Sequence, residues 1–268
     1  MRIPFTKAHG AKNDFLLTWA TDAPRQALPE AARAICDRHT GVGADGWMLV
    51  EGAPDKSQHD GAIRLFNADG SEAEISGNGT RCAAAFLLDA GVVSGPEVRI
   101  ATGAGVKALR LLRRSGLWFM LEMNMGCPEV TPENLRASVP LVSGEREATI
   151  VSVGNPQCAV FVESFEFDWR GVGAEIERHS MFPNRTNVSF VRVVDRNTLD
   201  VRFFERGAGE TMSSGTGSTG AVAAAIARGV AESPVRVITP AGPLELRCDT
   251  DLYLTAPAEI VAGGEFYF

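Results

Sequence analysis

Two stretches decide the fold: FNADGSEAEISGNGTRCAAAFLLDAGV at residues 66–92 and FERGAGETMSSGTGSTGAVAAAIARGV at residues 204–230. A shift of 138 positions superposes them and places Ser76 on Ser214. Matches at this density indicate an internal repeat, and a repeat has to be identified before the fold is predicted from single elements. Two similar halves that face each other would bring their corresponding loops to a shared cleft.

Each copy predicts the same order of elements. An apolar strand (62–67; 199–205) leads into a Gly-rich loop and an Ala-rich helix (about 78–90; about 216–228), and a glycine follows each helix as the favoured C′ residue. Alternating Val, Ile and Arg then predict another strand in each copy, at 98–105 and 235–242. Outside the repeat we expect helices at 28–38 and near 171–180, and strands at 15–20, 46–51, 107–113, 117–123, 149–153, 158–163, 188–194 and 244–248.

Many strands and few helices indicate an α+β fold with one helix held against the strands of each half. Turn residues in MNMGCP (123–128) predict the boundary, which divides the chain into an N-terminal half at 1–124 and a C-terminal half at 125–268. The last strand, at about 260–268, is expected to pack back on the first half.

Composition excludes several classes of function. A net charge of −7 and no dense cluster of Lys and Arg argue against a nucleic-acid partner. Five cysteines without C-x-x-C spacing predict neither a disulfide framework nor a metal site. No run of 18 apolar residues predicts a membrane span, and the first 20 residues lack a signal-peptide pattern. We expect a cytoplasmic protein without a membrane partner.

The loops SGNG and SSGTG stand at helix starts, where unpaired N–H groups and the helix dipole attract anions. Two such helix ends could hold one carboxylate and present Ser76 and Ser214 to opposite sides of the attached carbon. The alternative is that both serines only cap their helices.

GTGSTG at 215–220 also matches the G-x-G-x-x-G fingerprint of dinucleotide-binding proteins, which would make the chain an oxidoreductase. Nine residues, 206–214, separate this run from the preceding strand, and Pro240 stands where an acidic residue would be expected. The first copy, GNGTRC, lacks the third glycine. This interpretation is the weaker one.

Six segments together resemble the diaminopimelate epimerase family over nearly the whole chain: HGAKNDF (9–15), DRHTGVGADG (37–46), FNADGSEAEISGNGTRC (66–82), GNPQC (154–158), FPNRTNVSF (182–190) and ERGAGETMSSGTG (205–217). The resemblance implies two pseudo-symmetric halves, each a sheet wrapped around a central helix, with the active-site cleft between them. It also implies a homodimer and a cofactor-independent isomerase of the lysine pathway that inverts the α-carbon of an amino acid, with the conversion of LL- to meso-diaminopimelate as the best guess.

The resemblance also assigns roles to residues. Its catalytic positions are Ser76 and Ser214, and four residues would bind the α-carboxylate through backbone N–H groups: Gly77, Asn78, Gly215 and Thr216. Six others would bind the reacting amino group and the distal end of the substrate: Asn13, Asn67, Asn155, Asn187, Glu205 and Arg206. The side-chain chemistry suits these roles, although each asparagine could also be a turn residue.

The chain departs from the family where the chemistry would occur. The family has cysteine at both catalytic positions, and a serine hydroxyl, with a pKa near water's ~15.7, costs roughly 10 kcal/mol more to ionise than a thiol of pKa ~8.5. Gln157 stands where the family usually has histidine, and Gly46 where it has glutamine. The first change removes a titratable neighbour, and the second enlarges the pocket or removes a polar contact.

Three hypotheses follow. The chain epimerises an amino acid with Ser76 and Ser214 as acid and base, whether these serines are natural or introduced to trap a ligand. Alternatively, the pocket performs another isomerisation or an elimination, with Glu205 or Asp45 as the base. In the third hypothesis the chain is a silent binder of an amino acid. Serines introduced to trap a ligand would account for positions 76 and 214, but they would not account for the departures from the family at Gln157 and Gly46.

Overall fold

The computed structural model describes all 268 residues, and its four α-helices among many strands make the chain α+β. The chain divides into two compact units. Unit 1 comprises Met1–Met123 and Ala256–Phe268, and unit 2 comprises Asn124–Thr255. The C-terminal residues that return to unit 1 therefore begin at Ala256, a few residues before the strand expected at 260–268.

The strands of unit 1 pair in a closed ring. In order around the ring they are β1 (Arg2–Gly10), β2 (Asn13–Trp19), β3 (Gly46–Gly52), β4 (Gly61–Asn67), β6 (Glu97–Thr102), β7 (Gly105–Ser115), β8 (Trp118–Gly126) and β17 (Leu252–Tyr267). The ring closes because β17 pairs with both β8 and β1. The β2–β3 and β4–β6 pairs are parallel, and the short strand β5 (Glu72–Ala73) adds to β4.

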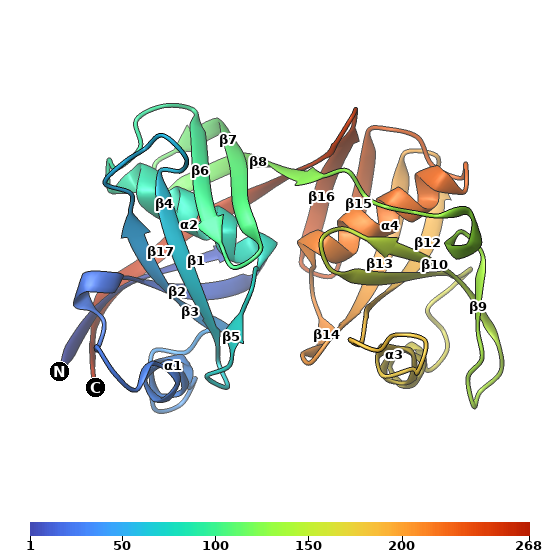
Figure 1. Cartoon of the computed structure of the whole chain (residues 1–268), viewed down its shortest axis with the longest axis horizontal. Coiled ribbons are helices and arrows are strands. Elements are labelled where there is room, and N and C mark those ends of the chain that lie inside the picture. The colour runs from blue at the N-terminus through green and yellow to red at the C-terminus, as the bar shows by residue number, and fades with distance from the viewer. The chain divides into compact units, whose positions relative to one another are not determined.

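Helix α2 (Gly77–Asp89) packs against six strands of this ring, β1 to β4, β6 and β7. Every residue from Gly77 to Leu88 is buried, the polar side chains of Asn78, Thr80 and Arg81 included. Because alanine side chains are small, the alanines at 83–85 let strands approach the helix closely from several directions. Helix α1 (Leu28–Cys36) packs instead on β3 and β4 and lies apart from α2, at the lower edge of unit 1 in Figure 1.

Unit 2 contains the strands β9 (Ala137–Val139), β10 (Arg146–Ser152), β11 (Pro156–Phe161), β12 (Asn187–Asp195), β13 (Thr198–Glu205), β14 (Gly209–Thr211), β15 (Val235–Thr239) and β16 (Gly242–Cys248). Here too two pairs are parallel, β11–β12 and β13–β15. Helix α4 (Gly215–Ala227) packs against β10 to β13, β15 and β16, whereas α3 (Trp169–Glu177) packs on β12 and β13.

The two units contain the same order of elements with the same pairing. The run β2, β3, β4, β5, α2, β6 in unit 1 corresponds to β11, β12, β13, β14, α4, β15 in unit 2, and the parallel pairs fall at equivalent places. Helices α2 and α4 each have 13 residues. The stretches that superpose in the sequence thus adopt the same local structure.

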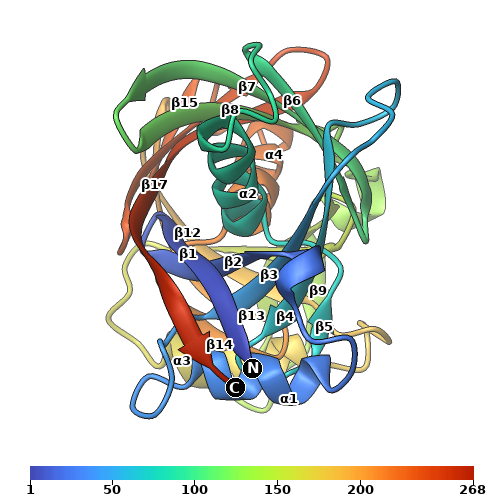
Figure 2. The same cartoon turned by 90° about the vertical axis from the view of Figure 1, so that its left-hand side faces the viewer.

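Strand β1 was absent from the sequence-based expectations. Its sequence contains Pro4, a residue that argues against a strand, and its burial does not alternate regularly, so it lacks the period that identifies a strand. Its partners are β2 and the far end of the chain, where Arg2 lies opposite Tyr267. The backbone N–H of Phe268 donates to the carbonyl of Met1 over 2.9 Å, so the chain ends lie side by side (Figure 2).

No helix in the structure combines the length and the apolar character that a membrane crossing requires.

Candidate functional site

The residues expected at the site form two groups, each within one unit. The first half-site, in unit 1, comprises Asn13, Asp45, Gly46, Asn67, Ser76, Gly77 and Asn78. The second half-site, in unit 2, comprises Asn155, Gln157, Asn187, Glu205, Arg206, Ser214, Gly215 and Thr216.

In the first half-site, Ser76 caps α2. Its backbone is extended, and its hydroxyl accepts a hydrogen bond of 3.1 Å from the N–H of Gly79. The N–H groups of Gly77 and Asn78 lie in the first turn, where a helix offers no intrahelical acceptor, so they are free for an anion. Capping and anion binding are therefore compatible here, because the serine uses a different N–H group.

The side chains of Asn13, Asp45 and Asn78 form one hydrogen-bonded chain. The Asn78 amide donates to Asn13 Oδ1 over 3.2 Å, and the Asn13 amide donates to Asp45 Oδ2 over 2.7 Å. The other oxygen of Asp45 accepts from Arg38 at 2.8 Å. Because the Asp45 carboxylate is occupied in this way, its evident role is to orient Asn13.

Gly46 and Asn67 lie opposite each other in the β3–β4 pair. A Cβ atom at Gly46 would meet the carbonyl oxygen of Phe66 at 2.9 Å and the Leu65 side chain at 3.2 Å. Gly46 is thus a site of close packing and does not enlarge a pocket, contrary to one of the two effects expected from its sequence. Asn67 donates to the Ser71 hydroxyl over 3.0 Å.

In the second half-site, Ser214 caps α4 in the same way, accepting from the N–H of Gly217 over 3.0 Å. Its own hydroxyl donates to Glu205 Oε1 over 2.6 Å. Burial raises the pKa of Glu205 above the usual value for a glutamate, and the hydrogen bond from Ser214 offsets part of this rise. A half-buried carboxylate in contact with a hydroxyl is an arrangement suited to moving a proton.

The remaining residues of the second half-site lie around the start of β12, where Asn187 is the first residue. Asn187 accepts from the N–H of Arg206 over 3.0 Å and donates to the carbonyl of Pro156 over 3.0 Å. Gln157, opposite Asn187 in the β11–β12 pair, donates to Asn155 Oδ1 over 2.8 Å. The buried Oε1 of Gln157 has no hydrogen-bond partner in the protein. Such an unpaired acceptor is costly unless water or a ligand supplies a donor.

The two half-sites differ at one decisive position. The shift that superposes Ser76 on Ser214 also superposes Asn67 on Glu205. Ser214 therefore has a carboxylate partner, whereas the hydrogen bonds of Ser76 involve no titratable side chain. Of the two serines, only Ser214 is hydrogen-bonded to a carboxylate that can take up its proton.

Two of the cysteines lie in the core of the protein. Cys82 and Cys158 are both fully buried. Burial raises the pKa of each thiol to about 12, so both stay protonated at neutral pH.

The GTGSTG run does not form a dinucleotide-binding turn. Its three glycines, Gly215, Gly217 and Gly220, all lie within α4, and a Cβ atom at Gly220 would meet Gln157 at 2.9 Å. In a dinucleotide fold these glycines would occupy the turn between a strand and a helix. The geometry therefore argues against the oxidoreductase interpretation.

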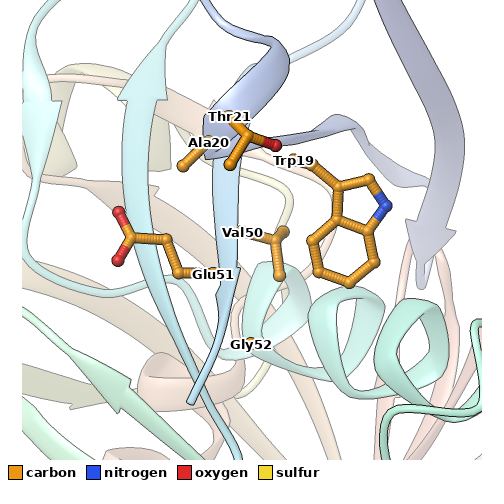
Figure 3. Close-up of a pocket in the computed structure, with 6 residues that line it drawn as sticks. All are labelled: Trp19, Ala20, Thr21, Val50, Glu51 and Gly52. Carbon is orange, nitrogen blue, oxygen red and sulfur yellow. The ribbon is translucent and has the colours of Figure 1, made fainter. Parts of the chain in front are cut away.

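A surface cavity of about 380 Å³ in unit 1 lies away from the first half-site (Figure 3). It is lined by Trp19, Ala20, Thr21, Val50, Glu51 and Gly52, with Trp19 and Glu51 extending to opposite sides in the figure. Trp19 ends β2, which begins at Asn13, so the cavity and Asn13 are roughly 20 Å apart along the strand. The cavity is not part of the half-site.

Two buried charged residues next to the half-sites were missed in the sequence. Glu177, at the end of α3, accepts from the N–H of Gly207 over 3.2 Å and forms an ion pair with Arg185. It therefore connects the two loops that carry Asn187 and Arg206. Arg81 lies fully buried in α2. The only sequence signal for Arg81 was a lone arginine in an Ala-rich helix.

The comparisons with known proteins agree with one another. A family model described as diaminopimelate epimerase matches residues 5–130 and 149–261. The diaminopimelate epimerase of Azoarcus sp. (strain BH72) is 42% identical over 284 residues, which cover 99% of each chain.

Solved structures share the fold at lower identity. A hydroxyproline epimerase from Agrobacterium vitis matches with a TM-score of 0.74 and 16% identity, over 98% of this chain and 92% of that one. A methylitaconate-delta-isomerase matches with a TM-score of 0.70 and 16% identity, over 99% and 95%. These identities establish the fold alone, but the family model and the curated relative cover nearly the whole sequence. The chain belongs to the diaminopimelate epimerase family.

Proposed function

We propose that this protein is a cofactor-independent amino-acid epimerase that converts LL-diaminopimelate to the meso isomer, with Ser76 and Ser214 as its two acid–base groups. A relative of this name covers 99% of the chain, and the residue types that the resemblance assigns to substrate binding are present in the sequence. The observation that supports chemistry, beyond binding, is the 2.6 Å hydrogen bond from Ser214 to Glu205.

Glu205 addresses the energetic problem that serine creates. A free alkoxide at Ser214 would be too costly, but the hydroxyl can pass its proton to Glu205 while its oxygen takes the α-proton of the substrate. The serine stays neutral, and the negative charge of Glu205 moves to the substrate as a carbanion. To complete the epimerisation, Ser76 gives its hydroxyl proton to the carbanion and regains a proton from water, and protonated Glu205 releases its proton to solvent. The raised pKa of Glu205 makes it a stronger base than an ordinary glutamate.

Stabilisation of the carbanion falls to the helix starts. In this proposal the carboxylate-binding groups are the N–H groups of Gly77 and Asn78 at the start of α2 and those of Gly215 and Thr216 at the start of α4. The partial positive charge at each helix start also opposes developing negative charge. Asn13, Asn67, Asn155, Asn187 and Arg206 would bind the remaining polar groups of the substrate.

The difference between the half-sites predicts asymmetric catalysis. Ser214 can take a proton through Glu205, whereas Ser76 has Asn67 at the equivalent position and can take one only as a costly alkoxide. In D₂O, we expect α-deuterium exchange to be at least tenfold faster from one of the LL and meso isomers than from the other. Equal exchange from both would contradict the assignment of Glu205 as the sole proton acceptor.

The Ser76→Cys/Ser214→Cys variant tests the pocket independently of serine chemistry. Exchange by the unmodified protein would support catalysis by serine, and exchange only by the variant would mean that the pocket binds the substrate but cannot abstract its proton. If neither protein exchanges or binds LL-diaminopimelate, the substrate assignment is wrong.

A single-base reaction is the second candidate. One carboxylate, Glu205, bonded to Ser214 without an equivalent partner for Ser76 favours an isomerisation or elimination in which one group removes a proton and returns it elsewhere. Analysis of the products by NMR distinguishes the two, since epimerisation leaves the connectivity of the amino acid unchanged. Binding of the amino acid without any product would identify a silent binder.

We also propose a cytoplasmic homodimer. The five cysteines are all free, as suits a reducing compartment, and the resemblance to the family implies two copies. Sedimentation of the purified protein measures the oligomeric state directly, and a monomer at all concentrations would contradict it.

A further inference from the structure

Arg81 is the most unusual charge in the structure. It lies in α2 one turn after Gly77, and its exposed fraction is 0%. The equivalent position in α4 is Thr219, so the charge belongs to the first helix alone.

The guanidinium of Arg81 has only neutral hydrogen-bond partners. Nη1 donates to the carbonyl of Gly77 over 3.2 Å, Nη2 donates to Asn78 Oδ1, and Nε has no partner. The carboxylates of Asp14 and Asp45 in the same unit are bound instead by Arg38, and Asp14 also by Lys7. Burial lowers the pKa of Arg81 to about 10, so the group is still charged at neutral pH. A buried charge without a counter-ion destabilises a fold, which calls for a compensating role.

The location of Arg81 suggests that role. Its two donors contact Gly77 and Asn78, the residues whose N–H groups open α2. A positive charge under a helix start adds to the partial charge that the helix already carries there. The backbone is also shaped for this group, because a Cβ atom at Gly10 would come within 3.3 Å of Nη2.

Arg81 also determines which way the Asn78 amide faces. Since Oδ1 of Asn78 accepts from Arg81, its amide nitrogen must point the other way, where it donates to Asn13. Asn13 in turn donates to Asp45. The guanidinium therefore stands at one end of the chain of hydrogen bonds that orients the two asparagines of the first half-site.

We propose that Arg81 is a positioning residue of the first half-site, which strengthens the attraction of α2 for the carboxylate of the substrate and holds the side chains of Asn78 and Asn13 in their binding orientation. This inference rests on the proposed function for its substrate. Its effect on the asparagines is independent of any activity.

The test compares three variants of the full chain. Arg81→Met removes the charge at similar volume, Arg81→Lys retains it, and Arg228→Met is the matched control. Arg228 is another arginine with a mostly buried side chain, 6% exposed, and it contacts Glu147 and Thr149 away from both half-sites. We expect the Kd for LL-diaminopimelate, measured by calorimetry, to rise at least tenfold in Arg81→Met, to recover at least partly in Arg81→Lys, and to change less than twofold in Arg228→Met.

A second readout needs no substrate. Exchange of the Asn78 side-chain amide protons with solvent, followed by NMR, should accelerate at least tenfold in Arg81→Met and stay unchanged in Arg228→Met. If the wild type does not bind diaminopimelate, the proposed function fails, and this exchange still decides whether Arg81 positions Asn78. An unchanged Kd and unchanged amide exchange in folded Arg81→Met would overturn the inference. If that variant does not fold, Arg81→Lys decides, because loss of the fixed contact to Asn78 should still accelerate amide exchange.

Discussion

At the scale of single residues, the proposed chemistry depends on a contact between two side chains nine positions apart. Ser214 and Glu205 belong to different elements, the start of α4 and the end of β13. Their hydrogen bond turns an ordinary helix cap into a candidate proton relay. Asn67 and Ser76 have the same spacing and lack that property, so one substitution within a repeat separates two otherwise similar half-sites.

Replacing Glu205 by glutamine should separate activity from stability. We expect α-proton exchange to fall about 10² to 10⁴-fold, the usual contribution of a general base. A matched control is Glu210→Gln, which removes an exposed carboxylate paired with Arg170 on the surface. Glu210→Gln should keep full activity. If Glu205→Gln also kept full activity, Glu205 would not be the base.

The same variant should be more stable than the wild type at neutral pH. The pKa of Glu205 is raised in the folded protein, so the folded state binds its proton more tightly than the unfolded chain does. Its favourable contribution is complete below the unfolded pKa of ~4.3 and is lost as the pH rises through the folded pKa. Thermal melting at pH 7 should therefore show a higher Tm for Glu205→Gln, and a lower Tm would contradict a raised pKa.

The pH dependence of activity follows from the same shift. Catalysis needs ionised Glu205, so kcat/KM should fall on the acid side with a midpoint above the usual range of glutamate. The acid limb should disappear in Glu205→Gln together with most of the activity. A midpoint near 4.3 would indicate an unperturbed carboxylate.

At the scale of elements, α2 and α4 begin alike but are packed differently. A Cβ atom at Gly217 would meet the Phe203 ring at 2.8 Å, whereas at Gly79 the nearest atoms include the flexible end of Met48 at 3.3 Å. The Phe203 side chain is 1% exposed and has little room to move. The two glycines thus occupy equivalent positions but tolerate a side chain to different extents.

Alanine at these glycines measures the difference. In a helix, Gly→Ala by itself stabilises by up to about 1 kcal/mol, whereas overpacking costs about 1–3 kcal/mol. We expect Gly79→Ala to be close to neutral and Gly217→Ala to lower the free energy of unfolding, as measured by urea denaturation. Equal effects at both positions would mean that Phe203 can shift as easily as Met48.

At the scale of the whole molecule, the ends of the chain complete unit 1. Strand β17 pairs with β1 along eight residues of β1 and contributes buried Ala256, Ala258 and Ile260. Without it, the ring of unit 1 would have two open edges, at β1 and β8.

Removal of residues 256–268 should therefore disrupt one unit more than the other. We expect amide protection against hydrogen exchange to be lost in β1 and β8, while β11 and β12 retain more of theirs, because β17 pairs with β16 in unit 2 only through residues 252–255. Removal of Phe268 alone, which is 42% exposed, is the control and should leave protection in both units. An equal loss of amide protection in both units would contradict the inference that residues 256–268 complete the strand ring of unit 1 alone.

The sequence by itself determined the repeat, the α+β class, both central helices and the serine caps, because these depend on composition, periodicity and residues close in the chain. Family resemblance supplied the expected roles of the asparagines. Only the tertiary structure shows that Tyr267 pairs with Arg2 and that the carbonyl oxygen of Phe66 leaves no room for a side chain at Gly46. It also shows that the buried Arg81 contacts Gly77 and Asn78. Each of these contacts joins residues that are brought together by the fold, so the order of residues alone does not reveal it. The same holds for the basicity of Glu205, since burial and a hydroxyl partner set its pKa, and neither is visible in the order of residues.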